Sequence, residues 1–416
     1  MTGAGVPEDV LATAREGADS IFRYVERTAI PDPAGFHWRT LDYDNTYRED
    51  AATVFNGMAG IALFLADYHR TTGSSRAREL AEGAIRWSET KVPGMLDDWT
   101  APGAPRHDLC FGRTGIGLAW MRLHLATKDA AHLARVRPYV DALHAYDPGK
   151  LPAVVTDYLG GVAGLGLFLV RYWEVTGDAD SRETAARFGR WLRENRETGE
   201  RGVCWHLGAP AAAIPPEHNP AYLGYAHGLA GIAHFLVLLH RATGDPQWER
   251  LVRDCAATLD RHAVPNHGGL NWPYTTSGSG ADKVQWCHGS PGIGLFYAAA
   301  YEDLKDPAYL ATARAAGDCT FAAGDIRGNP SQCHGLAGNA ELFLELYRIT
   351  GDALWLARAH DFARRMLAYR VETPEGEAWQ ADEPGFHSPD FMCGASGTGH
   401  FFLRLLSGGR LPLALY

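Results

Sequence analysis

The sequence lacks any apolar stretch of the roughly 18 residues that a membrane-spanning helix needs. Its N-terminal segment has no basic region followed by an apolar run, so it does not match a secretory signal peptide. Positive charge is also scarce, because 39 Lys and Arg against 49 Asp and Glu give a formal net charge of −10. This balance argues against a nucleic-acid partner, and it is compatible with a basic peptide substrate without indicating one. We expect a cytoplasmic protein without a membrane span.

Cysteine is also scarce. In addition, no run of alternating apolar and polar residues is long enough to predict strands in place of helices. The chain has 7 cysteines among 416 residues, an odd number without disulfide-framework spacing. Such usage favours a reducing compartment, with a metal-binding or catalytic role for a few of the thiols. The contents of hydrophobic residues (46%) and charged residues (21%) are ordinary for a soluble globular protein.

The sequence does contain an internal repeat, marked by glycine. The pattern Gly-x-x-Gly, followed each time by an apolar helical stretch, occurs seven times at intervals of 46 to 67 residues. One helical hairpin with its loops has this period. The seven glycine pairs are Gly57/Gly60, Gly112/Gly115, Gly161/Gly164, Gly228/Gly231, Gly289/Gly292, Gly335/Gly338 and Gly394/Gly397.

More polar, amphipathic helices are expected between the glycine-led ones, because their apolar residues recur at helical spacing. Examples are 8–27, 181–195, 246–263 and 353–370. The chain therefore reads as an outer helix and then an inner helix, seven times over. An open solenoid and a closed toroid are both compatible with this order, and closure is favoured because small residues begin every inner helix. We predict an all-α fold, an α/α toroid of seven helical hairpins forming one domain over 1–416.

The loops indicate which end of the helices is functional. Connections from inner to outer helices are short, as at Thr176-Gly177-Asp178, and are typical of helix C-caps. Connections from outer to inner helices are long and rich in Gly, Pro and aromatic residues, which is more often functional than structural. The long connections are 28–54, 92–111, 197–224, 264–286 and 371–392. All of them meet the Gly-x-x-Gly end, which we therefore predict to be the active face.

Two adjacent repeats place Cys-His directly before the first glycine, in WCHGSPG and QCHGLAG. Cys and His in equivalent positions of neighbouring repeats suggest a zinc site. The candidates are Cys287, His288, Cys333 and His334. Four ligands would make a closed structural site and three an open catalytic one, and the spacing does not decide between them. The structural alternative is two buried cysteines beside hydrogen-bonded histidines.

The segments WCHGSPGIGL, QCHGLAGNAELFLEL, YAHGLAGIAHFL and SPDFMCGASGTGHFFLRLL resemble the lanthionine synthetase C family of LanC-like lanthipeptide cyclases. The resemblance covers essentially the whole chain, and it implies a sevenfold α/α toroid. It also implies that Zn²⁺ is held by Cys287, Cys333 and His334. The family's acid–base residues correspond to His227 and Asp157.

Two positions depart from the family's pattern. Lys283 stands where some members carry arginine, and His288 stands where some carry tyrosine. The roles of these two residues are therefore less defined than those of the ligands.

The resemblance implies a lyase-type lanthionine synthetase. Zinc deprotonates a coordinated thiol, and the thiolate of a peptide cysteine would add to dehydroalanine or dehydrobutyrine to close a (methyl)lanthionine ring. His227 would protonate the resulting enolate, and Asp157 would orient His227 or accept the thiol proton. Lys283 would steady the enolate or a substrate carbonyl, and His288 would orient a ligand. The N-terminal ends of the inner helices would also favour negative charge at this face.

Each of these residues also has a structural interpretation. His227 could be an ordinary hydrogen-bonded histidine, Asp157 a helix-capping loop residue and Lys283 a solvated lysine. Tyr225, Trp272 and Trp286 could line a peptide groove, although aromatic residues at helix ends more often pack in the core.

The expected partners are a dehydrated precursor peptide with leader and core, and a separate dehydratase or kinase/lyase enzyme, because the repeats leave no room for a dehydrating segment. Three other functions are compatible with parts of the sequence. A zinc protein of the same fold could conjugate glutathione to dehydrated or electrophilic targets. A non-catalytic scaffold could bind peptide or stabilise a partner enzyme. A glycosidase toroid would need paired carboxylates in place of the cysteines.

Overall fold

The computed structural model describes residues 5–415, which contain fourteen α-helices and six two-stranded antiparallel sheets. Two compact units share the chain discontinuously. Unit 1 comprises Met1–Gly94, Gly115–Arg137 and Gly324–Tyr416, and unit 2 comprises Met95–Thr114 and Pro138–Ala323. The single domain over 1–416 stays a prediction.

Unit 1 holds the first and last parts of the chain. Its helices are α1 (Glu8–Arg27), α2 (Met58–Thr72), α3 (Ser75–Glu89), η1 (Val92–Gly94), all but the first residue of α4 (Thr114–Thr127), α12 (Leu336–Thr350), α13 (Ala353–Met366), η5 (Leu367–Tyr369) and α14 (Ala395–Leu406). Its strands are β1 (Ile30–Asp32), β2 (Gly35–His37), β3 (Thr40–Leu41), β4 (Tyr47–Arg48), β11 (Arg370–Thr373) and β12 (Gly376–Trp379). The unit boundary falls within α5 (Ala130–Ala145).

Unit 2 holds the middle of the chain. Its helices are η2 (Pro148–Lys150), α6 (Val162–Thr176), α7 (Ala179–Glu194), η3 (Ala211–Ala213), η4 (Pro216–His218), α8 (Leu229–Thr243), α9 (Pro246–His262), α10 (Ser290–Leu304) and α11 (Pro307–Ala323). Its strands are β5 (Val154–Val155), β6 (Glu197–Gly199), β7 (Gly202–Cys204), β8 (Gly208–Ala209), β9 (Val264–Asn266) and β10 (Gly269–Asn271).

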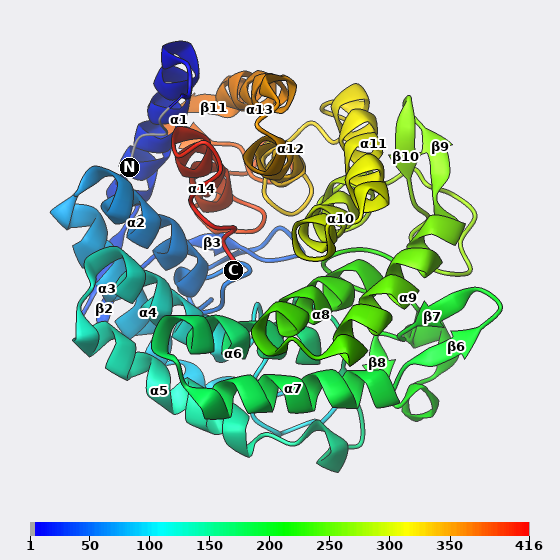
Figure 1. Ribbon diagram of the computed structural model, residues 1–416. Helices are drawn as coiled ribbons and strands as arrows, with labels where there is room; N and C mark the ends of the chain where they lie inside the picture. The colour runs from blue at the N-terminus through cyan, green and yellow to red at the C-terminus, as the bar shows by residue number, and fades with distance from the viewer. Residues whose placement is uncertain (1–4, 416) are drawn as a thin grey trace. The chain divides into compact units, whose positions relative to one another are not determined.

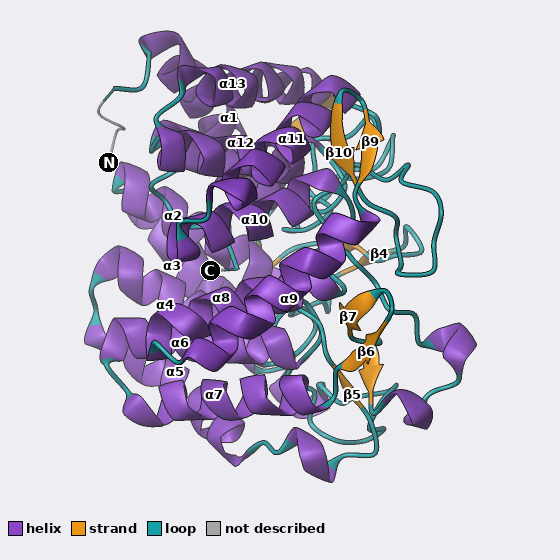
Figure 2. Ribbon diagram, turned by 45° about the vertical axis from the view of Figure 1, so that its right-hand side comes forward, coloured by secondary structure: helices purple, strands orange, loops and turns teal. Residues whose placement is uncertain are grey.

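The predicted helices are confirmed to within a few residues, and the strands are the main difference. The helix expected over 353–370 ends earlier, because β11 begins at Arg370. All strands, drawn in orange in Figure 2, lie in connections between helices and are two to four residues long. Elements this short carry too few residues to show an alternating pattern. Among the described residues, no helix is both long and apolar enough to cross a membrane.

Buried glycine-led helices alternate along the chain with amphipathic ones. The glycine-led α8 is buried continuously from Leu229 to Leu239, whereas α7 buries one face through Thr184, Phe188 and Leu192. Within unit 1, α2 packs on α3 and α12 on α13, while the N-terminal α1 packs on the C-terminal α14. Figure 1 shows α14, in red, beside the blue α2, and the two helices are in contact. The seventh glycine-led helix therefore packs against the first, as a closed ring of repeats requires.

In five of the seven motifs, the second glycine lies under the loop that precedes its helix. At Gly164, a Cβ would approach the carbonyl oxygen of Tyr158, six residues earlier, to less than 3.0 Å. Side chains essentially never come this close to backbone, so only glycine fits. The same contact with the carbonyl six residues earlier occurs at Gly60, Gly231, Gly292 and Gly397.

Loop carbonyls also satisfy the first-turn N–H groups of these helices, which have no partner within the helix. The bonds run from each donor to the residue seven positions earlier, as from Met58 N to Ala51 O (3.2 Å) and from Leu229 N to Tyr222 O (3.0 Å). At the start of α10, Ser290 N donates to the Asn271 side chain instead (2.8 Å). The expectation that these N-termini favour negative charge at the active face is weakened, because their donors are already used.

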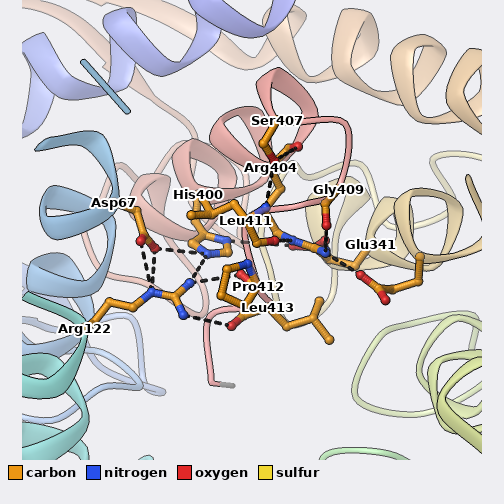
Figure 3. Close-up of polar contacts among 11 residues, drawn as sticks. Asp67, Arg122, Glu341, His400, Arg404, Ser407, Gly409, Leu411, Pro412 and Leu413 are labelled. Carbon is orange, nitrogen blue, oxygen red and sulfur yellow. Dashed lines mark hydrogen bonds and ion pairs between the residues drawn. The ribbon is translucent and has the colours of Figure 1, made fainter. Parts of the chain in front are cut away.

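A buried network of charged groups joins four segments of unit 1 (Figure 3). Arg122 on α4 donates twice to Asp67 on α2, at 2.9 and 3.0 Å, and also to the carbonyl of Pro412. His400 on α14 lies 3.1 Å from the Arg122 guanidinium, and burial lowers the pKa of His400 to about 4. The imidazole is therefore neutral and accepts this hydrogen bond. Arg404 pairs in the same way with Glu341 and donates to the carbonyl of Leu411.

Loss of one partner from this network should destabilise unit 1 strongly. We expect Arg122→Met to lower the free energy of unfolding by about 3–5 kcal/mol, because Asp67 would keep a buried charge without its guanidinium. Urea denaturation measures the change. The exposed Arg76→Met, which breaks surface pairs, should cost about 1 kcal/mol or less.

The double variant Asp67→Leu/Arg122→Met separates charge from packing. It should be more stable than Arg122→Met alone, since no unpaired charge is then buried. Equal stability of the single and double variants would contradict this account.

Candidate active site

The residues directly before the first glycine of each motif are linked by main-chain hydrogen bonds. In unit 2, the N–H of Cys110 donates to Leu159, that of Leu159 to Ala226, and that of Ala226 to Cys287, at 3.0, 3.3 and 3.1 Å. Each donor and acceptor stands two residues before a motif's first glycine. The alignment of the repeats is therefore a structural equivalence, and Cys287 ends this series.

Unit 1 contains a second series of the same kind. The N–H of Cys333 donates to the carbonyl of Met392 (2.8 Å), and that of Met392 donates to Phe55 (3.0 Å). The seventh repeat is thus bonded to the first through the same backbone position. Cys333 begins this series, just as Cys287 ends the other, so the two cysteines occupy equivalent places in consecutive repeats.

In unit 1, His334 is held by a carboxylate that the sequence analysis did not select. Its Nδ1 lies 2.9 Å from Oδ2 of Asp382, while Ser331 donates to the other oxygen of Asp382 at 3.0 Å. Although burial opposes the shift, the hydrogen bond and charge of His334 lower the pKa of Asp382. With Nδ1 engaged in this way, Nε2 is the nitrogen that remains for a metal.

Thiols accompany His334. Cys333 is buried, and Cys393 offers a sulfur within 4.8 Å of potential ligand atoms of His334 and Asp382. Burial raises the pKa of the Cys393 thiol to about 12. Cys393 stands outside the two Cys-His-Gly motifs, so the sequence motifs did not select it.

The donor set fits zinc by its chemistry. Thiolate sulfur and imidazole nitrogen are the ligands that zinc prefers, and unit 1 supplies both from Cys333 and His334. Unit 2 supplies the buried Cys287, whose Sγ lies 3.7 Å from the Gln285 amide oxygen. Of the other buried cysteines, Cys255 and Cys319 lie on α9 and α11, and Cys110 lies in the connection before α4. The chain thus has Cys and His groups that could hold a metal, and the three-residue ligand set stays a prediction.

In unit 2, His227 and Asp157 lie together as the sequence predicts. Nδ1 of His227 is 2.5 Å from Oδ2 of Asp157, whose side chain is 1% exposed, while that of His227 is 33% exposed. The buried carboxylate therefore orients a histidine whose other face reaches solvent. This pair repeats the arrangement of Asp382 and His334.

Asp157 also caps its own loop, which was the structural interpretation considered for this residue. Its other oxygen accepts the N–H of Gly160 at 2.7 Å. Asp108 and Asp390, four residues before the first glycine of their own motifs, cap their loops in the same way through the N–H of Phe111 and Cys393. Burial raises the pKa of Asp108 and of Asp390 to about 6. Capping is therefore common to three repeats, and the bond to histidine distinguishes Asp157.

Aromatic rings connect the other two candidates of unit 2. His288 stacks on His227 with ring centroids 5.8 Å apart, and the ring of Tyr274 lies 4.1 Å from that of His288. Lys283 places its ammonium 4.0 Å from the centroid of the Tyr274 ring. A cation at this distance interacts favourably with the ring face. Four predicted residues, His227, Asp157, His288 and Lys283, thus form one contiguous cluster in unit 2.

Gly224 explains why His288 fits there. A Cβ at Gly224 would come closer than 3.0 Å to Nδ1 of His288 and to the carbonyl oxygen of Cys287. The missing side chain therefore lets the imidazole lie against the backbone of the neighbouring repeat.

The three aromatic residues considered for a peptide groove pack in the core, which is the commoner role of aromatic residues at helix ends. Tyr225, Trp272 and Trp286 are 1%, 1% and 4% exposed. The Tyr225 hydroxyl lies 2.8 Å from Nδ1 of His234, and Trp272 donates to the carbonyl of Leu259. The rings that do contact the candidate cluster are Tyr274 and Tyr222, which no motif marked.

Comparison with known proteins identifies the family. The model of the family described as lanthionine synthetase C-like protein matches residues 49–415. The chain belongs to the lanthionine synthetase C-like family. This confirms the relationship inferred from the Cys-His-Gly motifs.

Two curated relatives match parts of this lanthionine synthetase C-like protein. Glutathione S-transferase LANCL1 of Danio rerio is 30% identical over 197 residues, which are 46% of this chain and 45% of that protein. LanC-like protein GCL1 of Arabidopsis thaliana is 36% identical over 160 residues, or 37% of this chain and 35% of the relative. The chain thus spans less than half the length of each of these relatives.

The fold is shared with a solved structure. Nisin cyclase superposes with a TM-score of 0.67 over 96% of both chains, at 17% sequence identity. At this identity the likeness shows the fold alone. It confirms the predicted all-α class with the α/α toroid of seven hairpins.

Removal of the Asp382 carboxylate charge should weaken any zinc site that uses His334. We expect Asp382→Asn to lower zinc affinity by ~10–100-fold, the usual loss when a carboxylate holding a ligand histidine is changed. Competition with a chromophoric chelator measures the affinity. Asp361→Asn, a charge-matched change in a surface ion pair of α13, should leave it unchanged. Equal losses in both variants would assign Asp382 no specific role.

Proposed function

We propose that this protein is a zinc-dependent cyclase that adds cysteine thiols of a dehydrated ribosomal peptide to dehydroalanine or dehydrobutyrine. The observation that carries the proposal is the pair of oriented histidines, His227 on Asp157 and His334 on Asp382. They stand at equivalent positions of two repeats in a chain of this family. One is suited to proton transfer and the other to metal binding.

Cys287, Cys333 and His334 would hold the zinc. Two thiolates and one imidazole leave an open coordination position, as in catalytic rather than structural sites. Bound zinc would supply the acidity that converts a substrate thiol to thiolate at neutral pH. The bond between Asp382 and His334 fixes the tautomer that this role needs.

The proton balance of the reaction assigns a task to His227. A C–S bond forms at the β-carbon of the dehydro residue, and the electron pair of its double bond passes to the enolate. The α-carbon must then gain one proton, so addition consumes no oxidant or reductant. His227 delivers this proton from the imidazole face that Asp157 leaves open.

The residues next to His227 would supply positive charge near the reacting groups. Lys283 and His288 both contact the Tyr274 ring, and His288 also stacks on His227. First-turn N–H groups such as those of Met58 and Leu229 are committed to loop carbonyls, and that of Ser290 to the Asn271 side chain. Positive charge near a forming enolate would therefore come from side chains such as Lys283.

Glutathione conjugation is the second candidate, because the relative from Danio rerio that matches part of this chain is named a glutathione S-transferase. Its chemistry would be the same thiol addition with a different nucleophile. Incubation of the protein with a dehydrated, cysteine-free peptide and glutathione tests it. Adduct formation above the uncatalysed rate would support this function.

The metal ligands can be tested by substitution. Purified protein should contain about one zinc per chain, as a three-ligand catalytic site predicts, and Cys333→Ala should lose both zinc and ring closure. Metal analysis and mass spectrometry after thiol trapping provide the two readouts. Cys204→Ala, in β7, should keep both. Full zinc in Cys287→Ala/Cys333→Ala would rule out this ligand set.

The role of His227 can be separated from metal binding. We expect His227→Ala to keep its zinc and fold but to close rings ~10²–10⁴-fold more slowly, the usual contribution of general acid–base catalysis. The exposed His218→Ala serves as the matched control and should retain activity. If His227→Ala loses zinc, His227 is itself a ligand. If it retains the parental rate, another residue is the acid.

A further inference from the structure

A small pocket of unit 1 opens beside His334. Its lining comes from the loop after β3, the end of the segment that leads into α2, the loop after β12, and the residues just before α12 and α14. Its volume is about 110 Å³. Ligand pockets that enclose whole small molecules measure roughly 300–1,000 Å³. The space is therefore suited to one side chain of a larger ligand.

The pocket adjoins a residue that the proposed function assigns to the metal. His334, its partner Asp382 and Cys393 are all part of the lining. A peptide whose cysteine reacts near His334 would bring the residues next to that cysteine to this pocket. The pocket is therefore placed to select those neighbouring residues.

The charge of the lining is one-sided. Its three carboxylates are Asp42, Asp382 and Glu383, and no lysine or arginine is among the lining residues. Asp42 already pairs with Arg48 at 2.7 Å, and Asp382 pairs with His334. Glu383 is exposed and has no ion-pair partner within residues 5–415. One negative charge in the pocket is thus left uncompensated by the protein.

Aromatic rings form the apolar part of the lining. Phe55 and Tyr43 lie with ring centroids 5.2 Å apart, and Tyr43 is 68% exposed. An aromatic face next to an unpaired carboxylate suits an ammonium or guanidinium group on an apolar stem, since rings attract cations and the stem packs on them. The same lining disfavours a carboxylate side chain, which Glu383 would repel.

We propose that this pocket binds the lysine or arginine side chain of a substrate residue adjacent to the reacting cysteine. The inference rests on the proposed function and adds to it a preference for basic residues in the peptide. The net charge of −10 acts in the same direction, because it attracts cationic peptides at long range.

Binding of unreacted peptides tests the pocket independently of ring closure. The probes are fluorescent peptides with one cysteine and intact serine, carrying lysine, norleucine or glutamate at the position before or after the cysteine. The zinc-loaded protein should bind the lysine peptide about fivefold more tightly than the norleucine peptide, as one exposed ion pair and one cation–π contact predict. The glutamate peptide should bind most weakly.

Substitution of Glu383 assigns the preference to the pocket. Glu383→Gln should reduce the lysine-to-norleucine ratio to near one, with zinc content unchanged. Glu375→Gln removes the same charge from the exposed turn between β11 and β12, outside the pocket, and should keep the ratio. An equal ratio in the parental protein, or a preserved ratio in Glu383→Gln, would overturn the proposal.

Dehydrated versions of the same peptides distinguish failure of the pocket proposal from failure of the proposed cyclase function. Ring closure with no dependence on the neighbouring charge would refute the pocket and leave the cyclase function standing. A lysine preference in binding without closure of any peptide would support the pocket and refute the cyclase function.

Discussion

The contact between a loop carbonyl and the second glycine, found in five of the seven Gly-x-x-Gly motifs, determines how this chain presents its candidate functional residues. At Gly231, for example, the carbonyl of Tyr225 occupies the space where any other residue would carry its Cβ. The loop is thereby pressed onto the first turn of α8, and its carbonyls take the N–H groups that the helix cannot satisfy itself. At α8, backbone atoms make these hydrogen bonds. The side chains just before the first glycine are therefore not needed to hold this junction together.

Because backbone contacts hold the loop on the helix, the positions before the first glycine can carry different side chains in different repeats. The residues before the first glycine are Ala226-His227 in one repeat and Cys333-His334 in another, yet the backbone bonds from Ala226 and Cys333 to the next repeat are equivalent. Each histidine then acquires a carboxylate from another loop, at 2.5 and 2.9 Å. The scaffold fixes where an imidazole stands, and the carboxylate fixes which nitrogen is available.

The helices, the repeat and the Cys-His candidates could be predicted from the sequence because each has a local signature. Apolar spacing marks α7, and glycine marks the start of α8. Asp382 could not be predicted, because it reaches His334 from a loop 48 residues further on and no motif surrounds it. Tyr274 was missed for the same reason. The six small sheets escaped notice since strands of two to four residues show no period.

The use of helix N-termini differs most from what the sequence suggested, and the difference bears on mechanism. Seven glycine-led helices beginning at one face would favour anions there if their N–H groups were free. Loop carbonyls accept hydrogen bonds from donors such as Met58 N and Leu229 N, so many of these N–H groups are not available to an anion. In the proposed reaction, a thiolate or an enolate at this face must then be stabilised by groups added to the scaffold. These are the proposed metal ligands and the cluster of His227, His288 and Lys283. Substitutions in that cluster should consequently change chemistry with little effect on folding, whereas substitutions at the motif glycines should do the reverse.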